Sequence, residues 1–213
     1  VMIPFYGDGQ AALRSLWSVA EISPKPDEFL LIDDGSAPGT GLPEGADLPP
    51  RTRVIRLPAN KGKAGALNVG LAQVKSEIVV CLDADTTAFS KDWAPMLAEF
   101  TRKKHLGAVT GKLRPHAVRN LLQLMQDFDY LAIISMVKCA ESAWGGLLTV
   151  SGAWVAIRRR ALRESGGWNA ATSAEDIDLS WRLQSAGWKV AYNLDWSARL
   201  ATAAAWRQLW SQR

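Results

Sequence analysis

Two pairs of acidic residues have the spacing of a metal and phosphate site. Asp33 and Asp34 follow one apolar stretch, and Asp83 and Asp85 follow another. Hard cations such as Mg²⁺ and Mn²⁺ prefer oxygen ligands, and they commonly bind one or two carboxylates together with substrate phosphates. A single pair of this kind is often only a solvated strand end, but two pairs at successive strand ends are harder to explain that way. The sequence therefore predicts a site for a divalent cation and a phosphate group.

A third acidic group lies at the start of segment 174–183. On helical spacing Asp176 shares a face with Leu179, which predicts that its side chain points inward. Asp178 lies four residues before Arg182, a spacing typical of a surface ion pair. An inward carboxylate at a helix start is either a structural cap or a catalytic base, and the local sequence leaves both interpretations open.

Residues 60–68 carry lysines and small residues and open a predicted helix. A helix N-terminus of this composition is a natural diphosphate site, with ordinary helix initiation as the alternative. Gly62, Lys63 and Ala64 resemble part of a P-loop. However, the required glycine spacing and the metal-binding hydroxyl are missing, so we exclude a Walker A motif.

Strands and helices alternate through the first half of the chain, which predicts an α/β fold with a mostly parallel sheet flanked by helices. Ligands of such sheets bind beside the carboxyl ends of the strands, where the acidic pairs lie. The loop at 37–50, rich in Pro and Gly, is predicted to be disordered or tolerant of insertions. The predicted elements are strands at 1–6, 28–33, 52–57 and 78–82, the last covered on both faces, and helices around 13–20 and at 64–74.

The second half has a different pattern. A long helix or helix pair is predicted at 118–138, and its 121–137 stretch suits either a membrane surface or a buried core. The other predicted elements are short strands within 149–157, a helix at 174–184, a strand at 189–193 and a helix from 203 onward.

Composition excludes several classes of protein. The 213 residues include 48% apolar and 22% charged residues, the balance of a globular domain and not of a disordered chain. No apolar stretch is long enough for a membrane-spanning helix. The net charge of +4 suits an anionic small molecule or an acidic membrane surface, and the absence of a basic run argues against nucleic acid.

The cysteines and histidines do not suggest a metal centre. Cys81 and Cys139 form no Cys-x-x-Cys pair, which argues against structural zinc. A reducing compartment fits, although one disulfide between them stays open. His105 and His116 are isolated among polar residues and are predicted to lie at the surface. Both chain ends look like cuts within a longer protein.

An alternative function rests on Gly7 and Gly9. The segment 7–12 matches the Gly-x-Gly-x-x-Ala dinucleotide fingerprint, which would indicate an NAD-type oxidoreductase. Phe5 and Tyr6 crowd the strand end where that fingerprint needs small residues. We therefore favour the interpretation that these glycines only turn the chain into a helix. An inactive module that binds a nucleotide sugar is a third alternative.

Five segments in this order resemble the family 2 glycosyltransferases of GT-A fold. The likeness runs along nearly the whole chain and is greatest to the membrane-bound processive branch, especially the poly-β-1,6-N-acetylglucosamine synthases; chitin oligosaccharide, hyaluronan and cellulose synthases are also similar. The segments are Leu31–Ser36, Asn60–Asn68, Asp83–Asp85, Thr149–Gly152 and Glu175–Asp176.

This resemblance implies an inverting transferase that moves a sugar, N-acetylglucosamine by similarity, from a UDP-sugar to a growing β-linked polysaccharide. Asp33 and Asp34 would hold uracil and ribose, Asp85 would coordinate Mg²⁺ or Mn²⁺, and Asp83 would contact the ribose or the metal. The implied residues that bind the nucleotide sugar are Pro4, Tyr6, Asp33, Asp34, Lys63 and Asp83.

For the acceptor, the resemblance implies that Ser151 and Gly152 line its site. Asp176 would be the catalytic base, next to Glu175. In the family an interfacial Gln-x-x-Arg-Trp motif follows, and Gln212 with Arg213 would open it here and contribute to acceptor binding.

The resemblance also implies a catalytic domain spanning 1–213. It would have a Rossmann-like nucleotide-binding half at 1–110 and an acceptor half at 111–213. Segments outside this chain would attach it to the cytoplasmic face of the plasma membrane. Two departures from the family pattern are Gly7-Asp8 in place of Asn-Glu, and Ala174 in place of the Thr of Thr-Glu-Asp.

Overall fold

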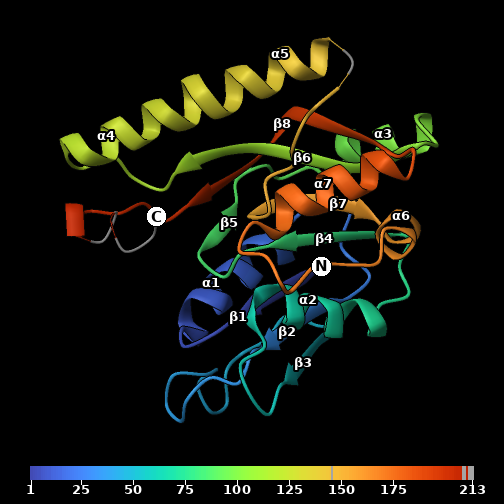
Figure 1. Ribbon diagram of the computed structural model, residues 1–213. Helices are drawn as coiled ribbons and strands as arrows, with labels where there is room; N and C mark the ends of the chain where they lie inside the picture. Colours follow the sequence, from blue (N-terminus) through green and yellow to red (C-terminus); the bar gives the residue numbers. More distant parts are fainter. Residues whose placement is uncertain (145, 208–209, 211–213) are drawn as a thin grey trace.

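The first four strands of the chain lie side by side and run parallel, in the order β3-β2-β1-β4. This computed structural model describes residues 1–144, 146–207 and 210. The parallel arrangement brings the carboxyl ends of the strands to one edge of the sheet (Figure 1). The elements are β1 (Met2–Phe5), α1 (Gly9–Ala20), β2 (Phe29–Asp33), β3 (Thr52–Arg56), α2 (Gly62–Gln73) and β4 (Ile78–Leu82).

The remaining strands extend the same sheet to eight, in the order β3-β2-β1-β4-β7-β6-β8-β5. Strand β7 (Trp154–Arg158) is antiparallel to both β4 and β6 (Leu106–Pro115). Strand β6 is parallel to β8 (Lys189–Leu200), and β5 (Thr86–Ala88) closes the edge antiparallel to β8. The predicted α/β fold with a mostly parallel sheet is therefore confirmed. The expected boundary between the two halves, at residue 110, falls inside β6.

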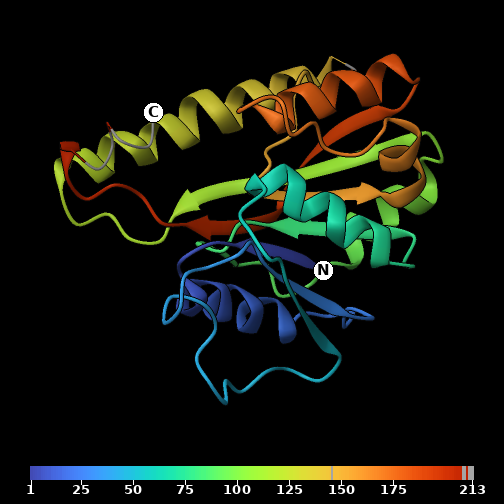
Figure 2. The same ribbon diagram turned by 60° about the horizontal axis from the view of Figure 1, so that its bottom comes forward.

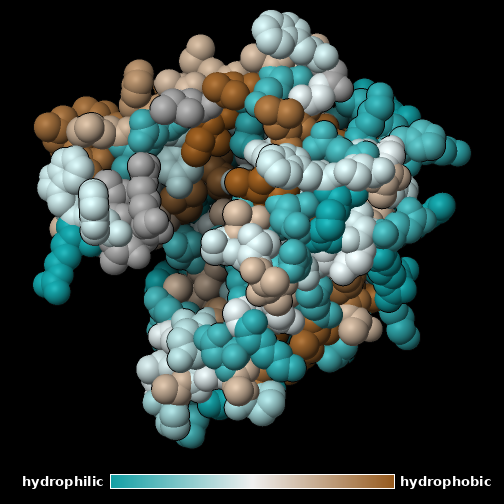
Figure 3. All heavy atoms as spheres, in the orientation of Figure 1, coloured by the Kyte–Doolittle hydropathy of each residue, from teal (hydrophilic) through white to brown (hydrophobic). Residues whose placement is uncertain are grey.

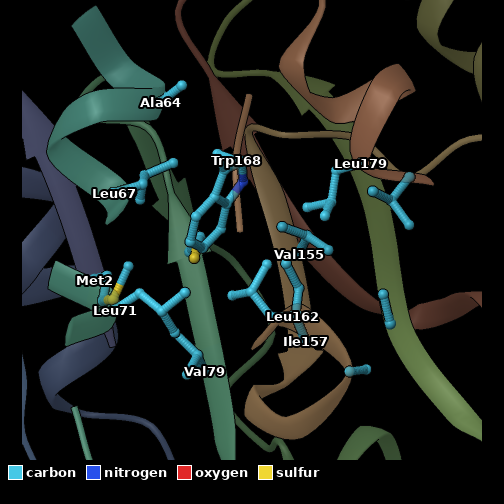
Figure 4. Close-up of a cluster of buried hydrophobic side chains, with 14 of the residues drawn as sticks. Met2, Ala64, Leu67, Leu71, Val79, Val155, Ile157, Leu162, Trp168 and Leu179 are labelled. Carbon is cyan, nitrogen blue, oxygen red and sulfur yellow. The ribbon is translucent and has the colours of Figure 1, made fainter. Parts of the chain in front are cut away.

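Apolar side chains alternate between the two faces of the sheet. Along β4, Val79 and Cys81 pack on one face, whereas Val80 and Leu82 pack on the other. The first face is covered by α2, α6 (Arg159–Glu164) and α7 (Glu175–Ser185), whose buried side chains meet the strands in Figure 4. The second face is covered by α1 and α3 (Ala94–Arg102). Burial on both faces explains the continuous apolar runs of these strands, as predicted.

A continuous helix passes over β6 and β8 at the end of the molecule opposite to β1–β3 (Figures 1 and 2). It consists of α4 (Leu121–Phe128), the π-helical η1 (Asp129–Met136) and α5 (Val137–Ala143). The predicted long helix is confirmed and ends later than expected. Its core alternative is wrong, because apolar side chains of α4 are exposed. Among the described residues, no helix is long and apolar enough to cross a membrane.

Several elements differ from the sequence-based expectation. Strand β6 and helices α3 and α6 were not predicted, and β8 continues well past residue 193. Gly111 in β6 lowers strand propensity, but a Cβ there would lie 2.0 Å from the Trp196 carbonyl oxygen, so glycine is required. Instead of short strands throughout 149–157, an irregular segment precedes β7.

Two further expectations concern a loop and the chain end. The predicted disorder at 37–50 is wrong, because this loop has a defined path and packs on α1; Gly9 N donates to Thr40 O at 3.1 Å and Trp17 Nε1 donates to Asp47 O at 3.3 Å. Of the helix predicted after 203, residues 206, 207 and 210 are helical. Gln212 and Arg213 lie outside the described residues.

Candidate active site

A pocket of about 330 Å³ opens at the carboxyl ends of β1, β2 and β4. It contains six of the residues predicted to bind the donor or the metal, namely Pro4, Tyr6, Asp34, Lys63, Asp83 and Asp85. The remaining lining residues are Phe5, Asp8, Ala11 and Ala84. The parallel strand order thus brings together residues that are far apart in the sequence.

Lys63 connects two parts of this site. Helix α2 begins at Gly62, whose φ of +75° is suited to glycine, and this places Lys63 in the first turn. The Lys63 Nζ atom lies 2.6 Å from Asp83 Oδ1 and 3.1 Å from Glu175 Oε1. Burial opposes the charged form of Lys63, but Asp83 and Glu175 together raise the pKa of the ammonium above its ordinary value. Lys63 is therefore a stable cation between two carboxylates.

Asp33 and Asp34 point in different directions, although they are adjacent. Asp34 lines the pocket, and its Oδ1 accepts a hydrogen bond from Lys61 N at 2.8 Å. Asp33 is buried, accepts a hydrogen bond from Ser36 N at 2.8 Å and lies 3.7 Å from Arg56 Nε. In this structure Asp33 stabilises the turn at 33–36 and does not line the pocket.

The carboxylates of Asp83 and Asp85 fit a divalent cation. Both line the pocket, and Asp85 is exposed, with its Oδ1 accepting a hydrogen bond from Thr86 Oγ1 at 3.5 Å. Burial raises the pKa of Asp83, and Lys63 offsets part of this rise. Within the described residues, no group of three or more His, Cys, Asp or Glu side chains could hold a metal by itself. A site with two carboxylates is completed by substrate phosphate oxygens, which is the usual arrangement for Mg²⁺.

Asp176 lies at the second residue of α7 and faces the loop before β7. Its Oδ2 accepts a hydrogen bond from Gly152 N at 3.0 Å. A Cβ atom at residue 152 would lie 3.1 Å from Asp176 Cβ and 3.3 Å from Lys63 Nζ, so glycine allows this close approach. Asp176 therefore points into the molecule, as predicted. The predicted ion pair between Asp178 and Arg182 is also present, at 2.7 Å.

Ser151 is held by its backbone and not by its hydroxyl. Its N–H donates to Thr110 Oγ1 at 3.1 Å, and its carbonyl accepts from Trp154 N at 3.1 Å. Thr110 was missed because its strand was not predicted. Ser180 was also missed, although its position four residues after Asp176 was a usable signal: its hydroxyl donates to Asp176 O at 2.6 Å.

The Gly7-x-Gly9 pattern has a structural explanation. Asp8 caps α1, with its carboxylate accepting from Ala11 N at 2.8 Å. Gly9 lies against the 37–50 loop, where a Cβ would come 2.1 Å from Gly41 O. These glycines shape a helix start and a loop contact, which agrees with the interpretation that we favoured over a dinucleotide fingerprint.

The isolated cysteines and histidines have the expected surroundings. His105 and His116 are exposed, and the His116 ring lies 3.3 Å from Thr87 Oγ1. Cys81 and Cys139 are both free thiols, so the disulfide left open above is wrong.

Comparison with known proteins gives the family of this chain and a structure of the same fold. The family model "Glycosyl transferase family 2" matches residues 1–166. The poly-β-1,6-N-acetyl-D-glucosamine synthase of Staphylococcus epidermidis is 32% identical over 222 residues, covering 100% of this chain and 52% of that protein. The synthase of the same name from Staphylococcus aureus (strain COL) is 29% identical over 196 residues, covering 90% of this chain and 47% of that protein. The chain spans about half the length of the curated relatives it matches.

Among solved structures, the mannosyltransferase PcManGT from Pyrobaculum calidifontis, in complex with GDP-Man and Mn²⁺, has the same fold. Its TM-score is 0.79 at 22% sequence identity, covering 98% of this chain and 58% of that chain. This likeness supports the GT-A fold, and the family assignment comes from the sequence match over residues 1–166. The chain belongs to glycosyl transferase family 2.

Proposed function

We propose that this chain is the catalytic domain of an inverting glycosyltransferase that moves N-acetylglucosamine from a UDP-sugar to a growing β-linked polysaccharide. One observation carries the proposal. The acids of the pocket and the carboxylate of Asp176 belong to one connected group. The Lys63 ammonium contacts both Asp83 of the pocket and Glu175 at the start of α7. Asp176 is the next residue of that helix, and its carboxylate accepts a hydrogen bond from Gly152 N. The choice of N-acetylglucosamine is supported by the names of the Staphylococcus relatives.

The donor would occupy the pocket at the strand ends. Pro4 and Tyr6 would flank the uracil, and Asp34 would accept hydrogen bonds from the nucleoside. The Lys63 ammonium would lie beside the diphosphate, where a fixed positive charge stabilises developing negative charge. Asp33, held by Arg56 and Ser36, would support this part of the site.

Asp83 and Asp85 would hold Mg²⁺ or Mn²⁺. When bound, the cation supplies Lewis-acid stabilisation of the charge on the departing diphosphate. The Mn²⁺ in the complex of the mannosyltransferase with GDP-Man supports a divalent cation in this fold. Two carboxylates at the mouth of the pocket match the ligand preference of both ions.

Asp176 would act as the general base. It would accept the proton of an acceptor hydroxyl while that oxygen forms a bond to the anomeric carbon of the donor sugar. The bond from the anomeric carbon to the β-phosphate oxygen would break, and UDP would leave with the bonding electrons. Attack from the side opposite to UDP inverts the anomeric configuration. The Gly152 N–H fixes one oxygen of Asp176, which keeps the carboxylate oriented.

The exposed face of α4 supports association with a membrane. Leu121, Leu124, Met125 and Phe128 follow the i, i+3, i+4, i+7 pattern on the outside. The buried residues of α4 are Leu122, Gln123 and Gln126. Figure 3 shows apolar atoms gathered over this end of the helix. Arg119 is exposed just before α4, so this surface would suit a bilayer with anionic lipids.

A vesicle experiment tests this membrane surface. The chain should sediment with vesicles of phosphatidylglycerol and phosphatidylcholine, and the double change Leu124→Glu with Phe128→Glu should abolish this. Val54→Glu is the matched control, because Val54 is also exposed but lies on β3. Equal binding of vesicles by the double variant and the unsubstituted chain would disprove the proposed membrane surface. The two cysteines are free thiols, as expected in a reducing compartment. This supports a location of the domain at the cytoplasmic face of the plasma membrane.

Transfer itself is tested by incubating the protein with labelled UDP-sugars, Mn²⁺ or Mg²⁺ and a β-linked oligosaccharide. We expect release of UDP and incorporation of label from UDP-N-acetylglucosamine. Binding of UDP without any transfer would instead indicate an inactive nucleotide-sugar module. Thermal stabilisation by NAD, and not by UDP with Mn²⁺, would favour the oxidoreductase alternative.

A further inference from the structure

The loop before β7 has an unusual set of hydrogen bonds. Residues 148–152 belong to no strand, yet their backbone groups bond to side chains from several elements. A bond of this kind attaches each residue from 148 to 152 to a neighbouring element, so these side chains determine the path of the loop. The bonds run from Leu148 N to Glu141 Oε2 (3.1 Å), from Gln184 Nε2 to Leu148 O (3.0 Å), from Lys138 Nζ to Thr149 O, from Val150 N to Ser180 Oγ (2.9 Å), from Ser151 N to Thr110 Oγ1 (3.1 Å) and from Gly152 N to Asp176 Oδ2 (3.0 Å).

Two of these side chains come from α5. Lys138 and Glu141 are three residues apart, so they lie on the same face of the helix. The Glu141 carboxylate accepts from Leu148 N, and the Lys138 ammonium donates to Thr149 O and lies 3.4 Å from Thr149 Oγ1. Hydrogen bonds to ionised groups are stronger than neutral ones. We call this pair the α5 clamp.

Lys138 is half-buried between α5 and the loop. Burial lowers its pKa, and the carboxylates of Glu141 and Asp176 partly offset this effect. The ammonium therefore stands close enough to Asp176 to interact with it electrostatically. A half-buried cation that bonds a carbonyl oxygen and interacts with two carboxylates is a specific arrangement and not a freely solvated side chain.

The other end of the loop contacts the candidate base. Val150 N donates to Ser180 Oγ, and that hydroxyl donates to Asp176 O at 2.6 Å. Gly152 N donates to the Asp176 carboxylate itself. Only two residues separate Thr149, which the clamp holds, from Gly152. A shift of the loop at Thr149 would therefore move the N–H that orients Asp176.

We propose that Lys138 and Glu141 are positioning residues for glycosyl transfer, which hold the loop at 148–152 so that Gly152 keeps Asp176 in its productive orientation. This proposal rests on the role proposed for Asp176 as the base. It implies that the position of the long helix α4–α5 is coupled to the orientation of the catalytic carboxylate. A displacement of about 1 Å in a reacting group can lower a rate by roughly 10²-fold, so this coupling matters for turnover.

Amide hydrogen exchange tests the clamp without requiring activity. In Lys138→Met and Glu141→Ala, we expect residues 148–152 to exchange at least about tenfold faster, because each change removes a hydrogen bond to an ionised group, which is the stronger kind. Lys138→Arg keeps the cation and should restore protection. Lys91→Met is the control, since the Lys91 ammonium forms an exposed ion pair with Glu21 at 3.7 Å, away from this loop. Unchanged exchange of the loop in both clamp variants would overturn the proposal.

A kinetic measurement distinguishes positioning from general damage. We expect kcat for transfer to fall about tenfold to 100-fold in Lys138→Met, while the KM for the UDP-sugar stays within about twofold. A rise in donor KM as large as the fall in kcat would mean that the fold is damaged, and it would overturn the assignment. If the unsubstituted protein binds UDP but transfers no sugar, the proposed function fails, whereas the exchange experiment still decides whether the clamp holds the loop.

Discussion

The ammonium of Lys63 lies 3.1 Å from the carboxylate of Glu175, so the first turn of α2 contacts the first residue of α7. The same ammonium lies 2.6 Å from Asp83 Oδ1. Without this cation, Asp83 and Glu175 would bring negative charge together in a partly buried site, which is unfavourable. Lys63 is therefore the link between the pocket and the helix that carries Asp176.

Replacing Lys63 should weaken nucleotide binding. Lys63→Met removes a charge from the pocket, and charged hydrogen bonds of this kind contribute about 1.5–3 kcal/mol. We expect the Kd for UDP with Mn²⁺, measured by calorimetry, to rise at least about tenfold. Lys61→Met is the matched control, because Lys61 contacts Asp34 through its backbone N–H. An equal loss in both variants would contradict the assigned role.

Removing Asp85 should affect only the metal-dependent part of binding. Asp85 is exposed at the mouth of the pocket, so Asp85→Ala should leave the fold intact. We expect UDP affinity in the presence of Mn²⁺ to fall to the level measured with a chelator. Asp27→Ala, another exposed acid, should retain the full effect of Mn²⁺. If Asp85→Ala still responds fully to Mn²⁺, Asp85 is not a ligand.

Asp176→Asn should separate transfer from donor binding. The amide oxygen of Asn can still accept from Gly152 N, but it cannot take up a proton. Loss of a general base typically costs about 10²–10⁴-fold in rate, so transfer should fall by that amount while the Kd for UDP stays constant. Asp178→Asn is the control, because Asp178 pairs with Arg182. Normal turnover by Asp176→Asn would refute the assignment of the base.

Gly152→Ala tests the close approach of the loop to α7. The added Cβ would lie 3.1 Å from Asp176 Cβ and 3.3 Å from Lys63 Nζ, so neighbouring atoms must shift. We expect a lower kcat and a destabilisation of about 1–3 kcal/mol, measured by thermal unfolding. Gly146→Ala is the control, because a Cβ there meets no atom within 4 Å. An unaltered melting temperature and kcat would show that the loop accommodates the added methyl group without strain.

The thiols of Cys81 and Cys139 should differ in their reactivity toward a thiol reagent. Burial raises the pKa of Cys81 to about 12, from an ordinary value of 9.0. In the native protein at pH 8, an aromatic disulfide reagent should therefore modify Cys139, which is partly exposed, before Cys81.

The same shift predicts a pH dependence. A thiol whose folded pKa is raised contributes stability fully below the unfolded value, and that contribution is lost as the pH rises from about 9 toward 12. The unfolding free energy of the unsubstituted protein should therefore fall more steeply above pH 9 than that of Cys81→Ala. Parallel curves for the two proteins would argue against the raised pKa.

The pocket was largely predictable because its residues follow buried strands with continuous apolar runs. Such runs identify β2 and β4, and a parallel sheet then brings Asp34, Asp83 and Asp85 together. The sequence could not separate Asp33 from Asp34. Which of these two adjacent residues faces the pocket depends on the turn at 33–36, where Asp33 is held by Ser36 and Arg56.

The loop before β7 was less predictable because its contacts are not local. Thr110 lies 41 residues from Ser151 in the chain, and no local pattern indicates their hydrogen bond. Strand β6 was missed because Gly107 and Gly111 weaken its strand pattern, although both are required by close neighbours, Trp188 and Trp196 respectively. Tertiary packing, which local propensity does not contain, decided this part of the fold.

The reversed direction of β7 has a further consequence. Because Trp154 pairs with Leu82, the segment that precedes β7 reaches the same edge as the ends of the parallel strands. Residues 146–152 of this segment take part in no strand pairing, so the path of residues 148–152 depends on the side chains that bond to them. The nucleotide pocket and the loop that contacts Asp176 therefore lie at the same end of these strands, so donor and acceptor would approach the protein from one direction in the proposed reaction.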